Sequence, residues 1–155
     1  MTDLSDLLEP QSVLAGVAVG NKRALFAALG TAAAAVWSLD AATVTAGLAA
    51  REKLGTTGFG GGIAVPHARI EGLEQVRGVF ARLSRPIDFD AVDDLPVDLI
   101  FMLVSPPDAG AEHLKSLARV SRRLRDRAFA DKLRGAGSPD ALYALLTAVE
   151  ARDAI

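Results

Sequence analysis

The sequence predicts a layered α/β domain, because segments of helical composition alternate with short apolar segments that suit β-strands. The strongest helical signal lies between residues 21 and 37. The strongest strand signal is the nearly continuous apolar run Val97–Val104, which suits a buried central strand. The chain has 155 residues, enough for one domain with a real core, and no repeat or linker divides it. We therefore expect a single domain over residues 1–155.

Two helices are expected in the first third of the chain. Asn21 suits the N-cap of the first helix, which runs to Trp37 and is rich in alanine. Asp40 suits the N-cap of the second helix, which runs toward Lys53 and has Gly55 as its stop signal. Ahead of both helices lies an apolar segment that a proline interrupts, with Leu4, Leu7, Leu8, Val13 and Leu14.

Strands and then helices are expected in the remainder of the chain. The strands cover residues 63–65, 75–83 and 97–104, and a turn with an extended edge covers 85–90. The helices cover 111–127, 129–133 and a last segment from Ser138-Pro139 through Val149. In the helix over 111–127, the arginines lie mostly outside one apolar stripe of Leu114, Leu117, Ala118, Ser121 and Leu124.

Composition and charge exclude several classes of function. The formal net charge is -2, which gives no reason to expect nucleic acid or an anionic membrane as a partner. The chain has no cysteine, so disulfides and thiolate metal sites are excluded. The acidic N-terminus is unlike a signal peptide, and the longest apolar tract is too short to span a membrane. The simplest expectation is a cytoplasmic protein without direct membrane insertion.

The segment most informative about function covers residues 55–69. Four glycines between residues 58 and 62 precede a short strand that ends at Pro-His67. Backbone N–H groups of glycines can approach an anion closely, and a neutral imidazole is a good nucleophile. The pattern favours a phosphoryl group on His67, contacted by the loop residues Thr57, Gly58, Gly60, Gly61 and Gly62. The alternative is a histidine that only caps a strand end, beside threonines that only cap the loop.

Two further residues are candidates for the same site. His113 opens a predicted helix, where its imidazole N–H could bind phosphoryl oxygens; alternatively it is an exposed first-turn residue. Arg51 precedes the glycine-rich loop, where its guanidinium could neutralise a phosphoryl group; alternatively it pairs with Glu52 in solvent. Arg69 could act as Arg51 does. This chemistry requires no metal and no cofactor.

Two charged clusters have simpler explanations. A polar turn accounts for the aspartates better than a zinc site does, because their spacing is a weak metal-ligand signal: Asp88, Asp90, Asp93 and Asp94. A solvated helix face accounts for the arginines, with an acidic partner as the alternative: Arg122, Arg123, Arg125 and Arg127.

Two blocks of the sequence resemble a known family. The first is Arg51-Glu-Lys-Leu followed by Thr57-Gly-Phe-Gly-Gly-Gly-Ile-Ala-Val-Pro-His67. The second runs from Pro86-Ile-Asp-Phe-Asp through Pro96-Val-Asp-Leu-Ile-Phe to His113-Leu-Lys-Ser-Leu. In order and spacing they are similar to phosphotransferase-system enzyme IIA domains of the fructose/mannitol and nitrogen-related type. The resemblance covers residues 21 to 149.

The resemblance implies a fold and a set of roles. It implies a mixed central sheet with helices on both faces, with His67 as the phosphoacceptor, His113 as the second active-site histidine and Arg51 as the active-site arginine. The donor would be a histidine-phosphorylated, HPr-like phosphocarrier protein. The form of the loop looks most like nitrogen-related IIA proteins, which regulate partners such as potassium transport and sensor kinase components.

Two alternatives stay open at this point. The chain could be a sugar-specific fructose or mannitol IIA component that passes its phosphoryl group to a IIB domain. It could also be a non-catalytic interaction module whose partners respond to the charge on His67.

Overall fold

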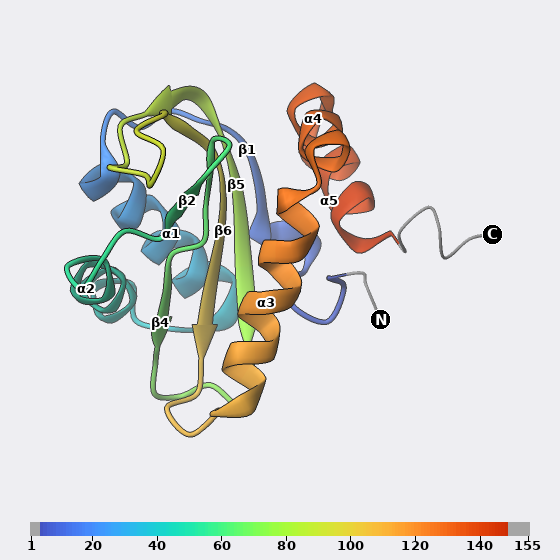
Figure 1. The fold of residues 1–155 in the computed structure, drawn as a ribbon. Coiled ribbons are helices and arrows are strands. Elements are labelled where there is room, and N and C mark those ends of the chain that lie inside the picture. The colour runs from blue at the N-terminus through green and yellow to red at the C-terminus, as the bar shows by residue number, and fades with distance from the viewer. Residues whose placement is uncertain (1–3, 149–155) are drawn as a thin grey trace.

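A mixed β-sheet runs through the centre of the molecule and carries helices on both faces (Figure 1). The structure is a computed structural model and describes residues 4–148. In these residues the sheet has six strands in the order β1-β5-β6-β3-β2, and β4 also pairs with β6. The strands are β1 (Val13–Val17), β2 (Gly58–Gly60), β3 (Ile63–Ala64), β4 (His67–Arg69), β5 (Arg77–Ile87) and β6 (Val97–Ser105). The predicted α/β class, with helices on both faces of a mixed sheet, is confirmed.

The helices form two groups that cover opposite faces of the sheet (Figure 1). The first group consists of α1 (Lys22–Trp37) and α2 (Ala41–Glu52). The second consists of α3 (Ala111–Arg125), α4 (Arg127–Gly135) and α5 (Pro139–Thr147). A short 3-10 turn, η1 (Pro10–Ser12), precedes β1. None of the helices described within residues 4–148 is both long enough and apolar enough to cross a membrane.

The apolar run of β6 is explained by two cores that share this strand. Ile100 and Met102 pack into the core beneath α1 and α2. Phe101 and Leu103 pack into the core beneath α3, α4 and α5. Successive residues of a strand point to opposite faces, so a strand covered on both sides needs an apolar residue at nearly every position.

The caps of several helices follow the sequence signals. Asn21, Asp40 and Ser138 each accept a hydrogen bond from a backbone N–H in the first turn of α1, α2 and α5. Asp126 caps α4 in the same way, so the two helices predicted over 111–127 and 129–133 are both present, with the boundary between them at Asp126. α2 has its C-cap at Lys53, two residues before Gly55. Val149 lies outside the described residues.

Three strands, β1, β2 and β4, were not predicted, and a fourth, β5, was predicted too short. The segment after Pro10 was not predicted as a strand, yet it forms β1, which pairs with β5 in parallel. The strand predicted over 75–83 continues to Ile87, because its pairing with β6 resumes at Val97 after a register shift. The short strand β2 was also missed, since a glycine-rich segment lacks the composition of a strand.

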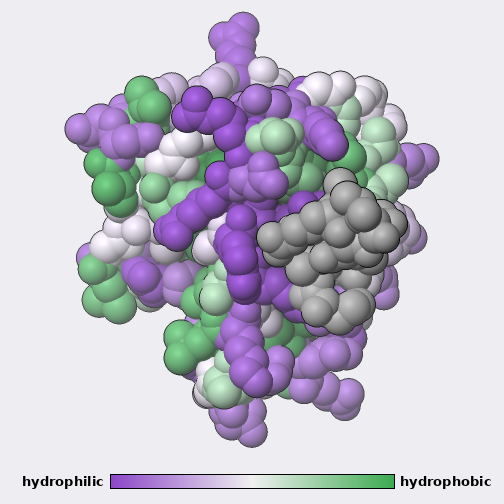
Figure 2. All heavy atoms as spheres, turned by 45° about the vertical axis from the view of Figure 1, so that its right-hand side comes forward, coloured by the Kyte–Doolittle hydropathy of each residue, from purple (hydrophilic) through white to green (hydrophobic). Residues whose placement is uncertain are grey.

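The predicted buried face of α3 is correct in part. Leu124 is buried and Leu117 packs against the core, as predicted, but Leu114 is 65% exposed. His113, Ser116, Val120 and Arg123 are buried as well, so Arg123 does not lie on the solvated face predicted for it. Polar residues with nearby partners occupy the inner face: the Arg123 guanidinium lies 3.7 Å from the centre of the Phe129 ring. Hydrophilic side chains run down the middle of the face that includes this helix (Figure 2).

Candidate functional site

His67 is the first residue of β4 and is half-buried. It lies where the chain passes from β3 to β4, two short strands that both pair with β6. The edge strand is interrupted at Pro66, whose carbonyl accepts a hydrogen bond from the Leu103 N–H. The ring Nδ1 lies 3.0 Å from the Val65 carbonyl oxygen. Because a carbonyl oxygen only accepts hydrogen bonds, this contact places the proton on Nδ1.

Arg51 comes from the last turn of α2 and contacts the other nitrogen of this ring. Its Nε lies 3.2 Å from His67 Nε2, and its Nη1 donates to the Gly55 carbonyl at 3.0 Å. A guanidinium only donates, so Nε2 must accept with its lone pair. The two contacts agree on one neutral tautomer of His67, protonated at Nδ1 and unprotonated at Nε2.

Glu52 does not pair with Arg51. The alternative that Arg51 is only a solvent-exposed partner of Glu52 is therefore wrong. The Glu52 carboxylate accepts from Lys22 Nζ at 3.1 Å. It also accepts from the backbone N–H of Thr57 at 3.0 Å and from its hydroxyl at 2.7 Å. Glu52 therefore holds the loop that follows α2, which leaves Arg51 to contact His67.

His113 lies beside His67, in the first turn of α3. The centres of the two imidazole rings are 5.3 Å apart, with an angle of 60° between their planes. His113 is buried, contrary to the exposed first-turn alternative, and its Nδ1 lies 2.6 Å from the Ser105 hydroxyl at the end of β6. Arg51 on α2, His67 on β4 and His113 on α3 thus share one site, although Arg51 and His113 are 62 positions apart in the sequence.

Burial disfavours the charged form of both imidazoles. Burial lowers the pKa of His67, and the positive charges of Arg51 and Arg69 lower it further. Burial, with the charge of Arg69 and the neighbouring His67, lowers the pKa of His113 to about 4. A neutral His67 keeps the lone pair on Nε2 that a nucleophile needs.

Arg69 adds a second cation next to the pair of rings. It lies two residues after His67 on β4, is exposed, and places Nη1 3.4 Å from the Pro107 carbonyl oxygen. Its charge acts on both histidines. Two guanidinium groups beside two neutral imidazoles make a site that suits a small dianion such as a phosphoryl group.

The structure does not bring the glycines of the loop together with His67. Gly60, Gly61 and Gly62 have φ angles of 109°, 70° and 81° and form the turn between β2 and β3. Ile63, next to this turn, pairs with Leu99, whereas His67 pairs with Leu103. Four residues of a strand span about 13 Å, so the turn and His67 lie at opposite ends of β6.

Thr57 and Gly58 occupy intermediate positions. The N–H and hydroxyl of Thr57 are both bonded to Glu52, and its carbonyl accepts from the Val65 N–H. Gly58 pairs with Ala64 and packs so closely that a Cβ there would lie 2.9 Å from the Ala91 Cβ. Thr57 therefore braces the backbone next to His67, and Gly58 is required for packing.

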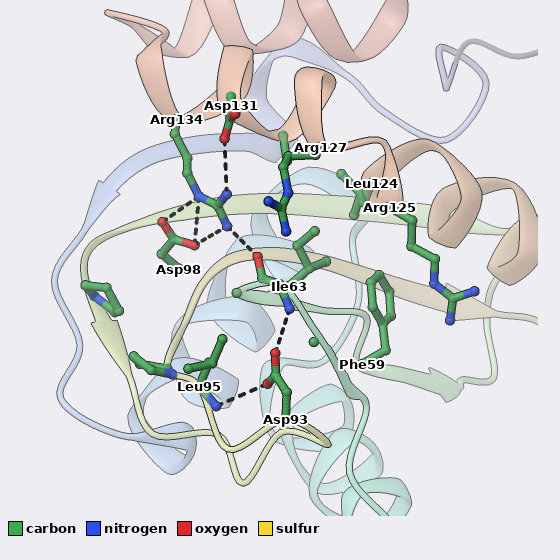
Figure 3. Close-up of a pocket in the computed structure, with 16 residues that line it drawn as sticks. Phe59, Ile63, Asp93, Leu95, Asp98, Leu124, Arg125, Arg127, Asp131 and Arg134 are labelled. Atoms are coloured by element: carbon green, nitrogen blue, oxygen red, sulfur yellow. Dashed lines mark hydrogen bonds and ion pairs between the residues drawn. The ribbon is translucent and has the colours of Figure 1, made fainter.

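A cavity of about 930 Å³ lies at the glycine turn and not at the histidines (Figure 3). Its charged groups are largely paired: Arg134 bonds the Asp98 carboxylate and the Gly61 carbonyl, and Asp93 accepts from the backbone N–H groups of Gly61 and Leu95. Asp88 accepts from the Asp90 N–H, so these aspartates act in turns. The chemistry of the two imidazoles, and not the volume of this cavity, makes their site the candidate.

Two residues of the site were not identified from the sequence. Ser105 contacts His113, and Lys22 completes the ion pair that holds Glu52. A polar residue at the end of an otherwise apolar buried strand was the available signal for Ser105. Nothing local to Lys22 indicates that it would meet a residue 30 positions away.

Comparison with known proteins defines the class of protein to which this fold and site belong. Residues 6–149 match the family model described as phosphoenolpyruvate-dependent sugar phosphotransferase system, EIIA 2. The chain belongs to this family, which confirms the resemblance seen in the sequence.

Several relatives of this chain carry the name nitrogen regulatory protein. The chain is 44% identical over 143 residues to the nitrogen regulatory protein of Bradyrhizobium diazoefficiens, covering 92% of this chain and 94% of the relative. It is 38% identical over 148 residues to that of Escherichia coli K12, covering 95% and 91%.

Solved structures agree with this assignment. The crystal structure of nitrogen regulatory protein IIA-Ntr from Neisseria meningitidis has a TM-score of 0.83 and 38% identity, over 92% of this chain and 97% of that one. The IIA mannitol structure from Escherichia coli has a TM-score of 0.73 over 87% of this chain and 96% of that one. At 21% identity, the mannitol structure supports the fold alone.

Proposed function

We propose that this protein is a nitrogen-related phosphotransferase-system IIA component that accepts a phosphoryl group on Nε2 of His67. The observation that carries the proposal is the pair of contacts that hold His67 in one tautomer, to Val65 through Nδ1 and to Arg51 through Nε2. They leave one nitrogen with an available lone pair and place a guanidinium beside it.

The donor is an HPr-like phosphocarrier that bears a phosphohistidine. His67 Nε2 attacks the phosphorus in line with the donor P–N bond. A new P–N bond forms at Nε2 while the donor bond breaks and its electron pair returns to the donor imidazole. Each phosphorylated ring keeps the proton on its other nitrogen, so no net proton transfer is needed. The proton on His67 Nδ1 stays bonded to the Val65 carbonyl throughout.

Arg51, Arg69 and His113 stabilise the charge on the transferring group. The N–H groups of Arg51 turn from the Nε2 lone pair to the phosphoryl oxygens when phosphorus occupies that position. His113 is neutral and can donate one N–H to the same oxygens. Arg69 adds positive charge from the solvent side of the site.

The role of the phosphorylated protein is mainly regulatory. Support comes from relatives that carry the name nitrogen regulatory protein at 38% and 44% identity. A phosphoryl group adds roughly two negative charges, which can release one partner and recruit another. The predicted targets, which include potassium transport and sensor kinase components, and the predicted cytoplasmic location are part of this proposal.

The test of acceptance is transfer from phosphoenolpyruvate through enzyme I and an HPr-like carrier, followed by intact mass measurement. We expect one added phosphoryl group in the unaltered protein and none in His67→Ala. His113→Ala serves as the matched control and should reach the same stoichiometry more slowly. Phosphate retained by His67→Ala would overturn the assignment.

A second measurement tests the regulatory part. Binding to a purified potassium-transport subunit or sensor kinase is compared for His67→Ala and the phosphate mimic His67→Asp. We expect the affinities to differ, because the charge at His67 is the proposed signal. Equal affinities for every target would argue against a phosphorylation switch.

A further inference from the structure

The Ser105 hydroxyl makes a short, buried contact with His113. Its oxygen lies 2.6 Å from His113 Nδ1, and both residues are buried. Ser105 ends β6 and is fixed by the sheet: it pairs with Arg69, and its carbonyl accepts from the Ile70 N–H at 2.8 Å. The hydroxyl is therefore a rigid anchor for the first turn of α3.

Hydrogen-bond satisfaction decides which of the two groups donates. Within the described residues, His113 Nδ1 is the partner that the structure gives the Ser105 hydroxyl. If Nδ1 carried the proton, the hydroxyl would accept, and its own hydrogen would be a buried donor without an acceptor. An unmet buried donor is costly, whereas an unused lone pair costs little. The hydroxyl therefore donates to Nδ1.

The ring nitrogen left for the site is then Nε2, and it carries the proton. His67 has the opposite arrangement, with its proton on Nδ1 and its lone pair on Nε2. The rings, 5.3 Å apart, thus present complementary groups, a nucleophile on His67 and a hydrogen-bond donor on His113.

We propose that Ser105 is a positioning residue that holds His113 in the Nε2–H tautomer and in a fixed ring orientation, so that this N–H can bind the phosphoryl group on His67. This inference rests on the proposed function, and it adds a residue that acts on the phosphoryl group only through His113. Ser105→Ala removes the hydroxyl and tests the proposal, and Ser105→Thr is the control that keeps the hydroxyl.

The tautomer can be read without any transfer assay. In the ¹⁵N-labelled, unmodified protein at neutral pH, two-bond ¹H–¹⁵N spectra of the imidazoles assign the protonated nitrogen of each ring. We expect His113 to be protonated at Nε2 and His67 at Nδ1. A proton on His113 Nδ1 would overturn the proposal, whether or not His67 accepts phosphate.

Transfer kinetics test the consequence. Ser105→Ala should slow phosphorylation of His67 by about 2- to 10-fold, the loss expected for one neutral hydrogen bond, with little change in the KM for the carrier. Ser105→Thr should recover most of the rate. In a His113→Ala background, Ser105→Ala should have no further effect.

The same cycle separates positioning from simple structural damage. An equal slowing by Ser105→Ala with and without His113 would contradict the proposal, because the serine would then act by another route. A failure of the proposed function itself would appear differently, as phosphate on His67→Ala or no phosphate on the unaltered protein, while the tautomer spectrum still reports on Ser105.

Discussion

At the scale of single residues, the site is defined by groups that act either only as hydrogen-bond donors or only as acceptors. The Val65 carbonyl can only accept and the Arg51 guanidinium can only donate, so together they assign both nitrogens of His67. Burial then keeps the ring neutral by lowering its pKa. Under the proposed function, His67 Nε2 would be ready as the nucleophile before a donor arrives.

The low pKa of His113 makes the stability of the fold depend on pH. Its pKa is lowered from 6.5 to about 4, so between these values the unfolded chain binds a proton that the folded chain excludes. The free energy of unfolding therefore decreases as the pH falls through this window. We expect a shallower decrease for His113→Gln, measured by urea unfolding at several pH values. Identical pH dependence in both proteins would refute this contribution.

Glu52 is the residue whose loss should most disturb the loop beside the site. Its side chain is 7% exposed and is bonded to Lys22 and to both donors of Thr57. Glu52→Ala leaves these groups unpaired and should lower the free energy of unfolding by about 2–4 kcal/mol. The exposed Glu74 provides the control, since Glu74→Ala should change it by less than about 0.5 kcal/mol. Similar values for the two variants in urea unfolding would contradict this role.

The site residues that could be predicted from the sequence are those whose side chains suit phosphoryl chemistry. Arg51, His67 and His113 were predicted together and lie together, because each is a polar residue placed at the end of a helix or strand. Ser105 was missed because a serine after an apolar run has no spacing signal of its own. Ser105 joins the site only through its contact with His113, which lies on α3, beyond the loop that follows β6.

At the scale of elements, the glycine-rich segment serves the hairpin turn between β2 and β3. A Cβ at Gly62 would lie 2.6 Å from Arg134 Nη2 and 3.0 Å from Asp98 Oδ1, and its φ of 81° is left-handed. Gly61 has a φ of 70°, but a Cβ there would meet nothing within 4 Å. These two glycines separate the effect of close packing from that of backbone conformation.

We predict that Gly62→Ala is more destabilising than Gly61→Ala. Gly61→Ala should lower the free energy of unfolding by about 1 kcal/mol from φ alone, and Gly62→Ala by about 2–3 kcal/mol. Both folded variants should accept phosphate from the carrier at a rate within about 2-fold of the unaltered protein, because the turn lies about 13 Å along β6 from His67. A much slower rate in Gly61→Ala, measured by mass, would place the turn in the site after all.

Element boundaries were predictable where a cap marks them and not elsewhere. Asn21, Asp40 and Ser138 begin helices because their side chains bond first-turn N–H groups, a local effect. β1 was missed because its hydrogen bonds depend on β5, where Val13 pairs with Phe80, far along the chain. The inner face of α3 was misjudged because His113 and Arg123 are buried by specific partners that hydrophobicity does not reveal.

At the scale of the whole molecule, β6 joins two cores into one folding unit. Phe101 belongs to the core beneath α3, α4 and α5, and Met102 belongs to the core beneath α1 and α2. If β6 left the sheet, apolar side chains of both cores would be exposed at once. The α/β class was predictable because this strand is apolar on both faces, a whole-fold property visible in a local sequence.

We expect a core variant on one face to destabilise both cores together. Phe101→Ala should lower the free energy of unfolding by about 3–5 kcal/mol, and unfolding should remain a single transition. Trp37 reports on the opposite face, where its ring N–H donates to the Gly78 carbonyl. Its fluorescence and far-ultraviolet circular dichroism should give the same urea midpoint, and two separate midpoints would show that the cores unfold independently.

We propose that His67 carries the phosphoryl group on Nε2, and a single NMR spectrum can decide whether it does. The ¹⁵N-labelled protein, phosphorylated through the HPr-like carrier, is examined for ³¹P–¹⁵N coupling at each imidazole nitrogen. We expect coupling at Nε2 of His67, with the proton retained on Nδ1. Phosphorus on Nδ1 of His67 would contradict the tautomer that Val65 and Arg51 favour, and phosphorus on His113 would contradict His67 as the acceptor.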